Sequence, residues 1–313
     1  MFEKIIEEIK KASSIIVVGH IRPDGDCYGS QVAIKELILA NFPGKEVYIT
    51  GTGMPDFFKM LGKMDHPSDE VYQKSLIFVV DLNELYRIED EKAKALGKNY
   101  VLLDHHIRIE QFDFPHVSIE DAVSTAEIVI DMIIEQNLVV TERCANALYL
   151  GILTDSGRFQ FGNDPEKIFH YCSELVKRGA KCKEIDRILS RQTLSSLETR
   201  GYVLSHLHKI DKGLIYIHLS KEEIKKLGIK PSSGSGLCHT FANVIGYPIW
   251  ATFMDADTGA CIIEVRSNKY DVVGTCMKYG GGGHKKAAGV TIQNYNNEIH
   301  EQFVNDLLEL IKE

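Results

Sequence analysis

The first half of the chain alternates between short apolar runs and longer segments with helical periodicity. Each apolar run has the length of a buried strand, and we predict strands at residues 13–19, 45–50, 76–80 and 100–103. Helices are predicted at residues 30–41, at 144–153 and at 124–135, where Ser124 and Glu127 have the spacing of a capping box. Strands that alternate with helices predict an α/β fold with a mostly parallel sheet flanked by helices.

The second half begins with a polar stretch and continues with a smaller group of elements. Residues 187–200 contain no apolar block, and we interpret this part as the connection between two domains. The prediction is a first domain over 1–190, a linker over 191–205 and a smaller α/β C-terminal domain over 206–313, with a cleft between the domains. Within the second domain, strands are expected at 214–219, 249–254 and 261–265, and a helix at 297–312.

The composition restricts the class of partner and the location. With 313 residues, 44% of them hydrophobic, the chain is long enough for two globular domains. The 36 Lys and Arg residues against 44 Asp and Glu give a formal charge of −8, which argues against long nucleic acid and favours small or short partners. Seven cysteines without a CxxC pair indicate reduced thiols. Because no signal peptide and no apolar run of about 18 residues is visible, we expect a cytoplasmic protein without a membrane partner.

Aspartate and histidine residues follow three of the predicted strands. His20, Asp24 and Asp26 form an H-x-x-x-D-x-D pattern after the first strand. Asp81 follows the third strand, and Asp104-His105-His106 follows the fourth. Since the carboxyl ends of parallel strands border the ligand crevice of such sheets, these side chains are expected at one edge.

Several carboxylates at close range cannot all stay ionised without cations. We therefore predict two divalent ions that neutralise Asp24, Asp26, Asp81 and Asp155. Mixed carboxylate and imidazole ligands disfavour structural zinc and Ca²⁺, so Mn²⁺ is the expected ion, with Fe²⁺, Co²⁺ and Mg²⁺ as alternatives. An isolated Asp at a strand end is more often a turn former or a helix cap, and Asp24-Gly25-Asp26 also suits a tight turn. The turn alone leaves His20 without a role, and four acidic positions together favour the metal site.

Longer motifs resemble those of a known family. H-x-x-P-D-G-D-x-x-G-S at residues 20–30, the strand-end Asp81, D-H-H at 104–106 and T-D-S-G-R-F at 154–159 resemble the successive motifs of the DHH phosphoesterase superfamily. In the second half, E-V-R-S at 264–267 and G-G-G-G-H at 280–284, followed by A-A-G at 287–289, resemble its DHH-associated C-terminal domain. The likeness covers nearly the whole chain.

The resemblance implies a division of ligands between two metal ions. One ion would be bound by His20, Asp24 and Asp81, and the other by Asp26, Asp81, His105 and Asp155. A shared ligand such as Asp81 is also expected on physical grounds, because two ions about 3.5–4 Å apart need a bridging group. A water molecule activated by both ions is the expected nucleophile.

Two other residues of the D-H-H motif are expected to act in catalysis. Asp104 is expected to orient His105 rather than to bind metal. His106, expected to point away from its neighbour, would donate to a phosphate oxygen or protonate the leaving group. The alternative for His106 is a structural histidine.

The C-terminal domain is expected to bind the rest of the substrate. Arg266 offers a planar fork of donors that suits a terminal phosphate, and consecutive glycines allow the backbone to approach a ligand closely. The predicted substrate-binding residues are Arg266, Ser267, Gly281, Gly282, Gly283 and His284. The alternatives are a solvated surface arginine and a merely flexible loop.

Within the superfamily, the chain resembles the stand-alone group that degrades very short RNA (nanoRNA) and dephosphorylates 3′-phosphoadenosine 5′-phosphate (pAp). Members of the same group cleave cyclic di-AMP or pApA, and this is the alternative. After D-H-H the group commonly has an Asn, whereas this chain has Ile107-Arg108-Ile109, so the substrate preference within the group is left open. Two further alternatives are a nucleotide-binding protein without turnover and a tRNA-editing module. A homodimer is left open.

Overall fold

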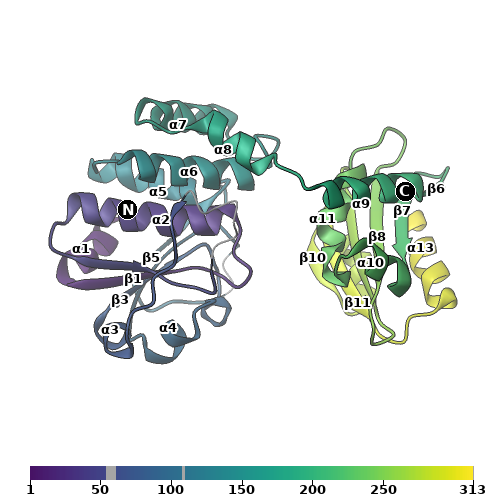
Figure 1. The fold of residues 1–313 in the computed structure, drawn as a ribbon, viewed down its shortest axis with the longest axis horizontal. Helices are drawn as coiled ribbons and strands as arrows, with labels where there is room; N and C mark the ends of the chain where they lie inside the picture. The colour runs from purple at the N-terminus through teal and green to yellow at the C-terminus, as the bar shows by residue number, and fades with distance from the viewer. Residues whose placement is uncertain (54–60, 108–109, 313) are drawn as a thin grey trace. The chain divides into compact units, whose positions relative to one another are not determined.

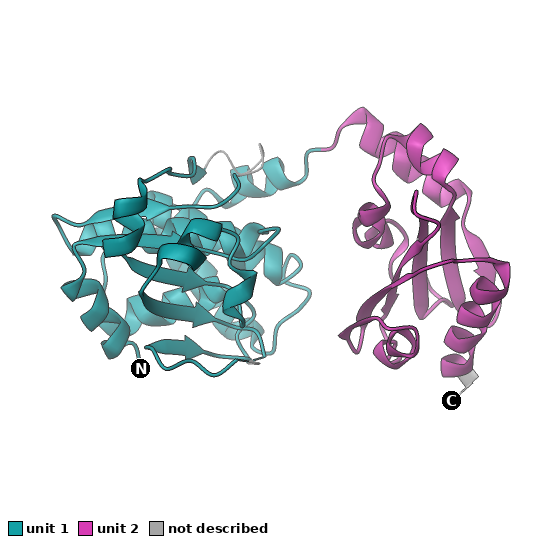
Figure 2. Cartoon of the chain, turned by 90° about the horizontal axis from the view of Figure 1, so that it is seen from below, with its two compact units in different colours: residues 1–191 teal, residues 192–313 magenta. Residues whose placement is uncertain are grey.

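The structure, a computed structural model, describes residues 1–53, 61–107 and 110–312 (Figure 1). Two of the three residues that follow the D-H-H motif, Arg108 and Ile109, thus lie outside the described residues. The chain forms two compact units, residues 1–191 and 192–313, each with its own hydrophobic core (Figure 2). All seven cysteines carry free thiols. In the part of the chain that the structure describes, no helix combines the length and the apolar character needed to cross a membrane.

The first unit is built on a five-stranded sheet in which every neighbouring pair is parallel, which confirms the predicted α/β class. The strand order is β2-β1-β3-β4-β5. The bounds are β1 Ser14–Val18, β2 Glu46–Ile49, β3 Leu76–Val80, β4 Asn99–Asp104 and β5 His116–Ser118. The short edge strand β5 has no apolar run in the sequence and is held by pairing with β4.

Both faces of this sheet are covered, and this explains why its central strands are apolar throughout. Ile15 and Val17 of β1 lie in the larger core, whereas Ile16 and Val18 lie in a second cluster on the other face. The larger core is formed with α1 Glu3–Lys11, α2 Gly25–Asn41, α5 Thr125–Gln136, α6 Glu142–Asp155, α7 Pro165–Lys177 and α8 Cys182–Leu189. The second cluster is formed with α3 Asp69–Lys74, the short η2 helix Leu85–Arg87 and α4 Glu91–Leu96.

The start of one helix and the capping bonds of another differ from the sequence prediction. Helix α2 begins at Gly25 rather than at residue 30, since the Asp24 side chain accepts the backbone N–H groups of Asp26 and Cys27 as an N-cap. Ser124 caps α5 as predicted by accepting the Glu127 N–H. The Glu127 carboxylate, however, accepts the backbone N–H of Val123, so the reciprocal bond to Ser124 that defines a capping box is absent from this helix start.

The second unit contains a mixed six-stranded sheet in the order β10-β11-β9-β8-β7-β6, in which only the β7–β8 pair is parallel. The strands are β6 His208–Ile210, β7 Leu214–Leu219, β8 Ile249–Asp255, β9 Cys261–Ser267, β10 Gly282–His284 and β11 Ala287–Ile292. One face packs against α12 Val273–Lys278 and α13 Asn297–Lys312. The other packs against α9 Leu194–Ser205, α10 Lys221–Leu227, α11 Gly234–Cys238 and the η4 helix His239–Phe241, with η3 Pro231–Ser233 between α10 and α11.

Most of the segment 191–205, expected as a linker, is helix α9. The Thr193 hydroxyl caps this helix by accepting the Ser196 N–H, and Val203 is buried in the core of the second unit. A largely polar sequence with two buried positions, Thr199 and Val203, forms such a helix once a cap and a neighbouring core are supplied.

Candidate metal centre and substrate-binding residues

Five side chains of the first unit converge at the carboxyl edge of its sheet. His20 follows β1, Asp81 follows β3 and His105 follows β4. Asp26 lies in the first turn of α2, and Asp155 is the last residue of α6. The structure thus brings together residues that are up to 135 positions apart, from His20 to Asp155.

Asp81 lies at the centre of this group and is almost fully buried. Its Oδ2 is 3.3 Å from Nε2 of His20, and its Oδ1 is 3.4 Å from Nε2 of His105. The backbone N–H of Asp81 donates to the Leu103 carbonyl, and its φ of 64° is in the left-handed region. Aspartate tolerates this conformation better than most residues, and here it turns the carboxylate between the two imidazoles.

Asp26, His105 and Asp155 form a second group, in which one donor atom of each lies within 4.8 Å of the others. Nε2 of His105 is 3.1 Å from Oδ2 of Asp155. Asp26 is fully buried and accepts the backbone N–H groups of Thr125 (2.7 Å) and Ala126 (3.0 Å) at the start of α5. A carboxylate is favoured there by the unpaired N–H groups of the helix end.

Asp24 lies at the border of the group. Its Oδ1 caps α2, while its Oδ2 is 3.9 Å from Nε2 of His20. The helix-cap role that the sequence left open for a strand-end Asp therefore applies to one oxygen of Asp24, and the other oxygen faces the histidine.

Opposite charges set the protonation of this group. Burial alone lowers the pKa of His105, but its bonds with Asp155 and Asp81 outweigh burial and raise the pKa to about 12. The same balance, with Asp81 as the partner, raises the pKa of His20 to about 9. Burial raises the pKa of Asp26, and the charges of Asp81 and Asp155 add to this effect. Burial also opposes ionisation of Asp81, but its bonds with His105 and His20 prevail and lower its pKa. The carboxylates that favour the protonated forms of His20 and His105 are thus the groups that would bind divalent cations.

The donor set fits divalent ions of intermediate hardness. It combines buried carboxylate oxygens with imidazole nitrogens, and these suit Mn²⁺ and its neighbours rather than Ca²⁺, which takes oxygen ligands. Besides burial, the charges of Asp81 and Asp155 keep the Asp26 pKa high, and bound cations would offset this repulsion.

The predicted pairing of Asp104 with His105 is wrong. Oδ1 of the buried Asp104 is 2.8 Å from Nδ1 of His106, whereas Nδ1 of His105 faces the Ala122 carbonyl at 3.2 Å. The two histidine rings lie 4.5 Å apart, and both approach Oδ1 of Asp81, so His106 does not point away from its neighbour as expected. Asp104 is the last residue of β4, and its side chain reaches the residue two positions on rather than the adjacent one.

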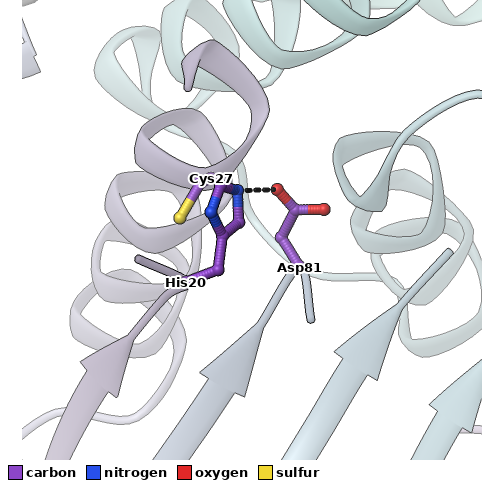
Figure 3. A group of neighbouring side chains, drawn as sticks. All are labelled: His20, Cys27 and Asp81. Carbon is purple, nitrogen blue, oxygen red and sulfur yellow. Dashed lines mark ion pairs between the residues drawn. The ribbon is translucent and has the colours of Figure 1, made fainter. Parts of the chain in front are cut away.

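Two residues near Asp81 were missed by the sequence analysis. The Thr125 hydroxyl donates to Oδ1 of Asp81 at 3.1 Å, and the only sequence signal for it was the helix start at Ser124. Cys27 lies beside His20 and Asp81 with donor atoms within 4.8 Å of one another (Figure 3). Burial raises the pKa of the Cys27 thiol, which packs so closely on Gly19 that a Cβ there would lie 2.1 Å from the sulfur.

In the second unit, the predicted substrate residues differ in their availability. Arg266, on β9, is held by several acceptors: Nη1 donates to Glu264 Oε2 (3.0 Å) and to the Val265 carbonyl, and Nη2 donates to Ser235 Oγ (2.8 Å). Ser267 is buried, and its hydroxyl accepts the backbone N–H groups of Lys269 and Tyr270. The Ser267 side chain therefore stabilises the turn after β9.

The glycine-rich segment forms an edge strand. Gly282, Gly283 and His284 make up β10, which pairs with β11. At Gly281 a Cβ would lie 2.3 Å from the Gly289 carbonyl oxygen, so the close approach of the two chain segments requires glycine there. Gly283 has a φ of 132°, a second reason for glycine, and His284 is exposed next to it.

Comparison with known proteins gives the family. The DHH family N-terminal domain model matches residues 14–152, and the DHHA1 domain model matches residues 211–313. A bifunctional oligoribonuclease and PAP phosphatase of Mycoplasma genitalium is 31% identical, with 92% of each chain covered. This chain belongs to the DHH family. The protein of the same name from Bacillus subtilis is 28% identical over 100% of this chain and 99% of the relative. The crystal structure of an exopolyphosphatase-related protein from Bacteroides fragilis has the same fold, with a TM-score of 0.86, 24% identity, and 100% and 97% coverage.

The family match coincides with the cluster in the first unit. His20, Asp24, Asp26, Asp81 and His105 all lie inside the DHH match, and Asp155 follows three residues after its end. The DHHA1 match contains the predicted substrate-binding residues of the second unit.

Proposed function

We propose that this DHH family protein hydrolyses phosphate esters of short nucleotides with two divalent metal ions, Mn²⁺ being the preferred ion. The substrates are short oligoribonucleotides and pAp. The observation that carries the proposal is the position of Asp81, whose two carboxylate oxygens face two histidines, each in its own group of donors.

The donors divide around Asp81 in a way that supports two metal positions. His20, Asp24 and Asp81 lie on one side, and Asp26, Asp81, His105 and Asp155 lie on the other. Ions held there would lower the pKa of water and offset the charge on the phosphoryl oxygens.

The chain's own residues add proton transfer and positioning. Asp104 holds Nδ1 of His106, which leaves Nε2 of His106 to donate a proton to a phosphate or leaving-group oxygen. The Thr125 hydroxyl and the first N–H groups of α5 fix Asp81 and Asp26 before any ion binds. In the second unit, the non-reacting phosphate would be bound by Arg266, by His284 and by the backbone of Gly281–Gly283. Ser267 would stabilise the adjacent turn.

The substrate class rests on relatives that match over nearly their whole length. Both relatives named above are described as bifunctional oligoribonucleases and PAP phosphatases. The net charge of −8 is consistent with short rather than long nucleic acid. The free cysteines support a reducing, cytoplasmic location.

The test is a comparison of turnover on pAp, pApA, cyclic di-AMP, pyrophosphate and short RNAs, with Mn²⁺ present and with chelator. We expect metal-dependent product from pAp and short RNA, and none from the Asp81→Asn variant. A preference for cyclic di-AMP or pApA would change the assigned substrate but not the metal-dependent hydrolysis of a phosphate ester. If the metal-loaded protein binds pAp but forms no product, the proposed hydrolase would instead be a nucleotide-binding protein without turnover.

A further inference from the structure

A second group of potential metal ligands lies in the second unit, apart from the residues discussed so far. His218 on β7, Asp255 at the end of β8 and Cys261 at the start of β9 each place a donor atom within 4.8 Å of the other two. Nε2 of His218 is 3.0 Å from Oδ1 of Asp255.

The register of the sheet explains why these three residues meet. Asp255 is paired with Cys261 across the antiparallel strands β8 and β9. His218 is paired with Phe253, two residues before Asp255, across the parallel strands β7 and β8. Phe253 and Cys261 belong to the core beneath α13, and side chains alternate along a strand, so all three donors project to this face.

The group is at the other end of the strands from the predicted substrate residues. Arg266 is paired with Trp250 at the beginning of β8, whereas Asp255 is its last residue. The group therefore does not belong to the phosphate-binding residues proposed above.

A cavity of about 270 Å³ gives access to two of the three donors. Its lining includes His218, Lys221, Asp255 and Tyr295. The side chains of His218 and Asp255 are each 29% exposed, while Cys261 is buried. The Lys221 ammonium, the one cation of this lining, lies 3.5 Å from the Asp257 carbonyl. The cavity has room for water as an additional ligand.

The ring of His218 is held in place by a second histidine. His300 stacks on it with ring centroids 5.1 Å apart at an angle of 13°. His300 is itself fixed, with Nδ1 2.8 Å from the Tyr295 hydroxyl and Nε2 3.3 Å from the Tyr216 hydroxyl.

The geometry points to a binding site for a thiophilic divalent ion of the Zn²⁺ class, held by His218, Asp255 and Cys261 with water from the cavity as the fourth ligand. Ligand bonds to zinc are about 2.0–2.3 Å long, so the ligand atoms of a tetrahedral site lie roughly 3.2–3.8 Å apart. Here His218 Nε2 and Asp255 Oδ1 are 3.0 Å apart, and all three donor atoms lie within 4.8 Å of one another. A thiolate selects Zn²⁺ over Mn²⁺, Mg²⁺ and Ca²⁺. The ion would join β7, β8 and β9 beside the 255–261 hairpin.

The test uses Co²⁺ as a spectroscopic substitute for Zn²⁺ in the full, metal-free chain. A cysteine thiolate bound to Co²⁺ gives a near-ultraviolet charge-transfer band that oxygen and nitrogen ligands do not give. We expect this band in the unmodified protein and in Cys27→Ser, and its loss in Cys261→Ser. Bound Zn²⁺ measured after dialysis should fall by one ion per chain in Cys261→Ser and in His218→Gln. The His218 variant replaces a partly exposed side chain, so it tests the site even if a change at buried Cys261 impairs folding.

The contrary outcomes are distinct. A band that persists in Cys261→Ser and vanishes in Cys27→Ser would place the thiolate in the first unit and overturn the proposal. No band, together with equal Zn²⁺ content in His218→Gln, would show that His218 and Asp255 form only a hydrogen-bonded pair. Hydrolysis with Mn²⁺ should stay within about twofold in Cys261→Ser, because Cys261 lies at the opposite end of β9 from Arg266 and in a different unit from the proposed metal ligands. If no ion binds to His218, Asp255 and Cys261, the proposed hydrolytic function is therefore unaffected.

Discussion

The carboxylate of Asp26, at the start of α2, accepts the backbone N–H of Thr125, at the start of α5, over 2.7 Å. Two helix starts that are far apart in the sequence thereby meet at one buried acid. Because burial and the charges of Asp81 and Asp155 raise the Asp26 pKa, the ionised form is costly without a cation.

The Asp26→Asn variant should separate metal binding from stability. We expect the Mn²⁺ affinity to fall at least about tenfold, since a charged ligand is lost. The stability of the metal-free protein should change by less than about 2 kcal/mol, because the amide keeps one acceptor and removes a buried charge. Calorimetric Mn²⁺ titration and urea unfolding measure the two effects. The matched control is Ser30→Ala, which removes a hydroxyl 3.4 Å from Oδ1 of Asp26. Unchanged Mn²⁺ affinity in Asp26→Asn would exclude Asp26 as a metal ligand.

Asp81→Asn should abolish turnover on every substrate. Asp81 faces both groups of donors, so we expect kcat to fall at least about a hundredfold. This is the order of the effect when a charge-stabilising group is removed from an active site. Asparagine tolerates the left-handed φ of 64°, whereas alanine would add about 1–2 kcal/mol of strain, so the Asn variant isolates the chemistry. Turnover at saturating Mn²⁺ is the measurement, and substantial residual activity would contradict the shared-ligand assignment.

Thr125 is predicted to orient Asp81 through its hydroxyl. Thr125→Val keeps the shape but removes the donor, and we expect a loss of about 10–100-fold in Mn²⁺ affinity, as for other groups that orient metal ligands. Thr125→Ser should retain most of the affinity. If Thr125→Val and Thr125→Ser bind Mn²⁺ with equal affinity, the hydroxyl does not orient Asp81.

The sequence predicted the parts of this site that follow from strand order. Asp81 and His105 directly follow buried strands, and His20 follows one after Gly19. Parallel strands bring such positions to one edge whatever the details of packing. Asp155 has a different origin, because it reaches the group from the end of a helix. The sequence placed Asp155 two residues after the predicted helix 144–153, and the T-D-S-G-R-F motif supported its inclusion.

The errors concern directions of side chains that only packing decides. Whether Asp104 reaches His105 or His106 depends on how the chain turns after β4, which no local pattern encodes. The role of Thr125 depends on where α5 begins relative to Asp81, and that of Cys27 on its close contact with Gly19. In the second unit, α9 was missed because its helical character depends on a cap and on one buried valine.

The stability of the metal-free protein should fall as the pH rises from about 6.5 to 9. The folded-state pKa of His20 is about 9 and that of His105 about 12, both above the unfolded value of 6.5. The stabilisation from their protonated forms is therefore complete below pH 6.5 and is lost as the pH rises through the folded values. The decrease should be on the order of a few kcal/mol. With Mn²⁺ the trend should reverse, because the metal competes with these protons.

Urea unfolding in chelator at several pH values measures this dependence. His20→Gln should flatten it, whereas His170→Gln, at an exposed position, should not. A metal-free protein whose stability is constant between pH 6.5 and 9 would refute the protonated state of the cluster.

Arg266 should act on substrate binding rather than on the chemical step. Its guanidinium is held in a fixed plane by Glu264, Ser235 and two carbonyl groups, so it can present its remaining N–H groups to a phosphate without first losing side-chain freedom. Arg266→Lys keeps the charge beside Glu264 but not the fork, and we expect KM for pAp to rise about tenfold with kcat within about twofold. Ser235→Ala removes one of the contacts that hold the plane and should raise KM by a smaller factor. Initial rates over a range of pAp concentrations give both constants. An unchanged KM in Arg266→Lys would indicate that Arg266 only braces β9 and β11, the strands that its contacts join.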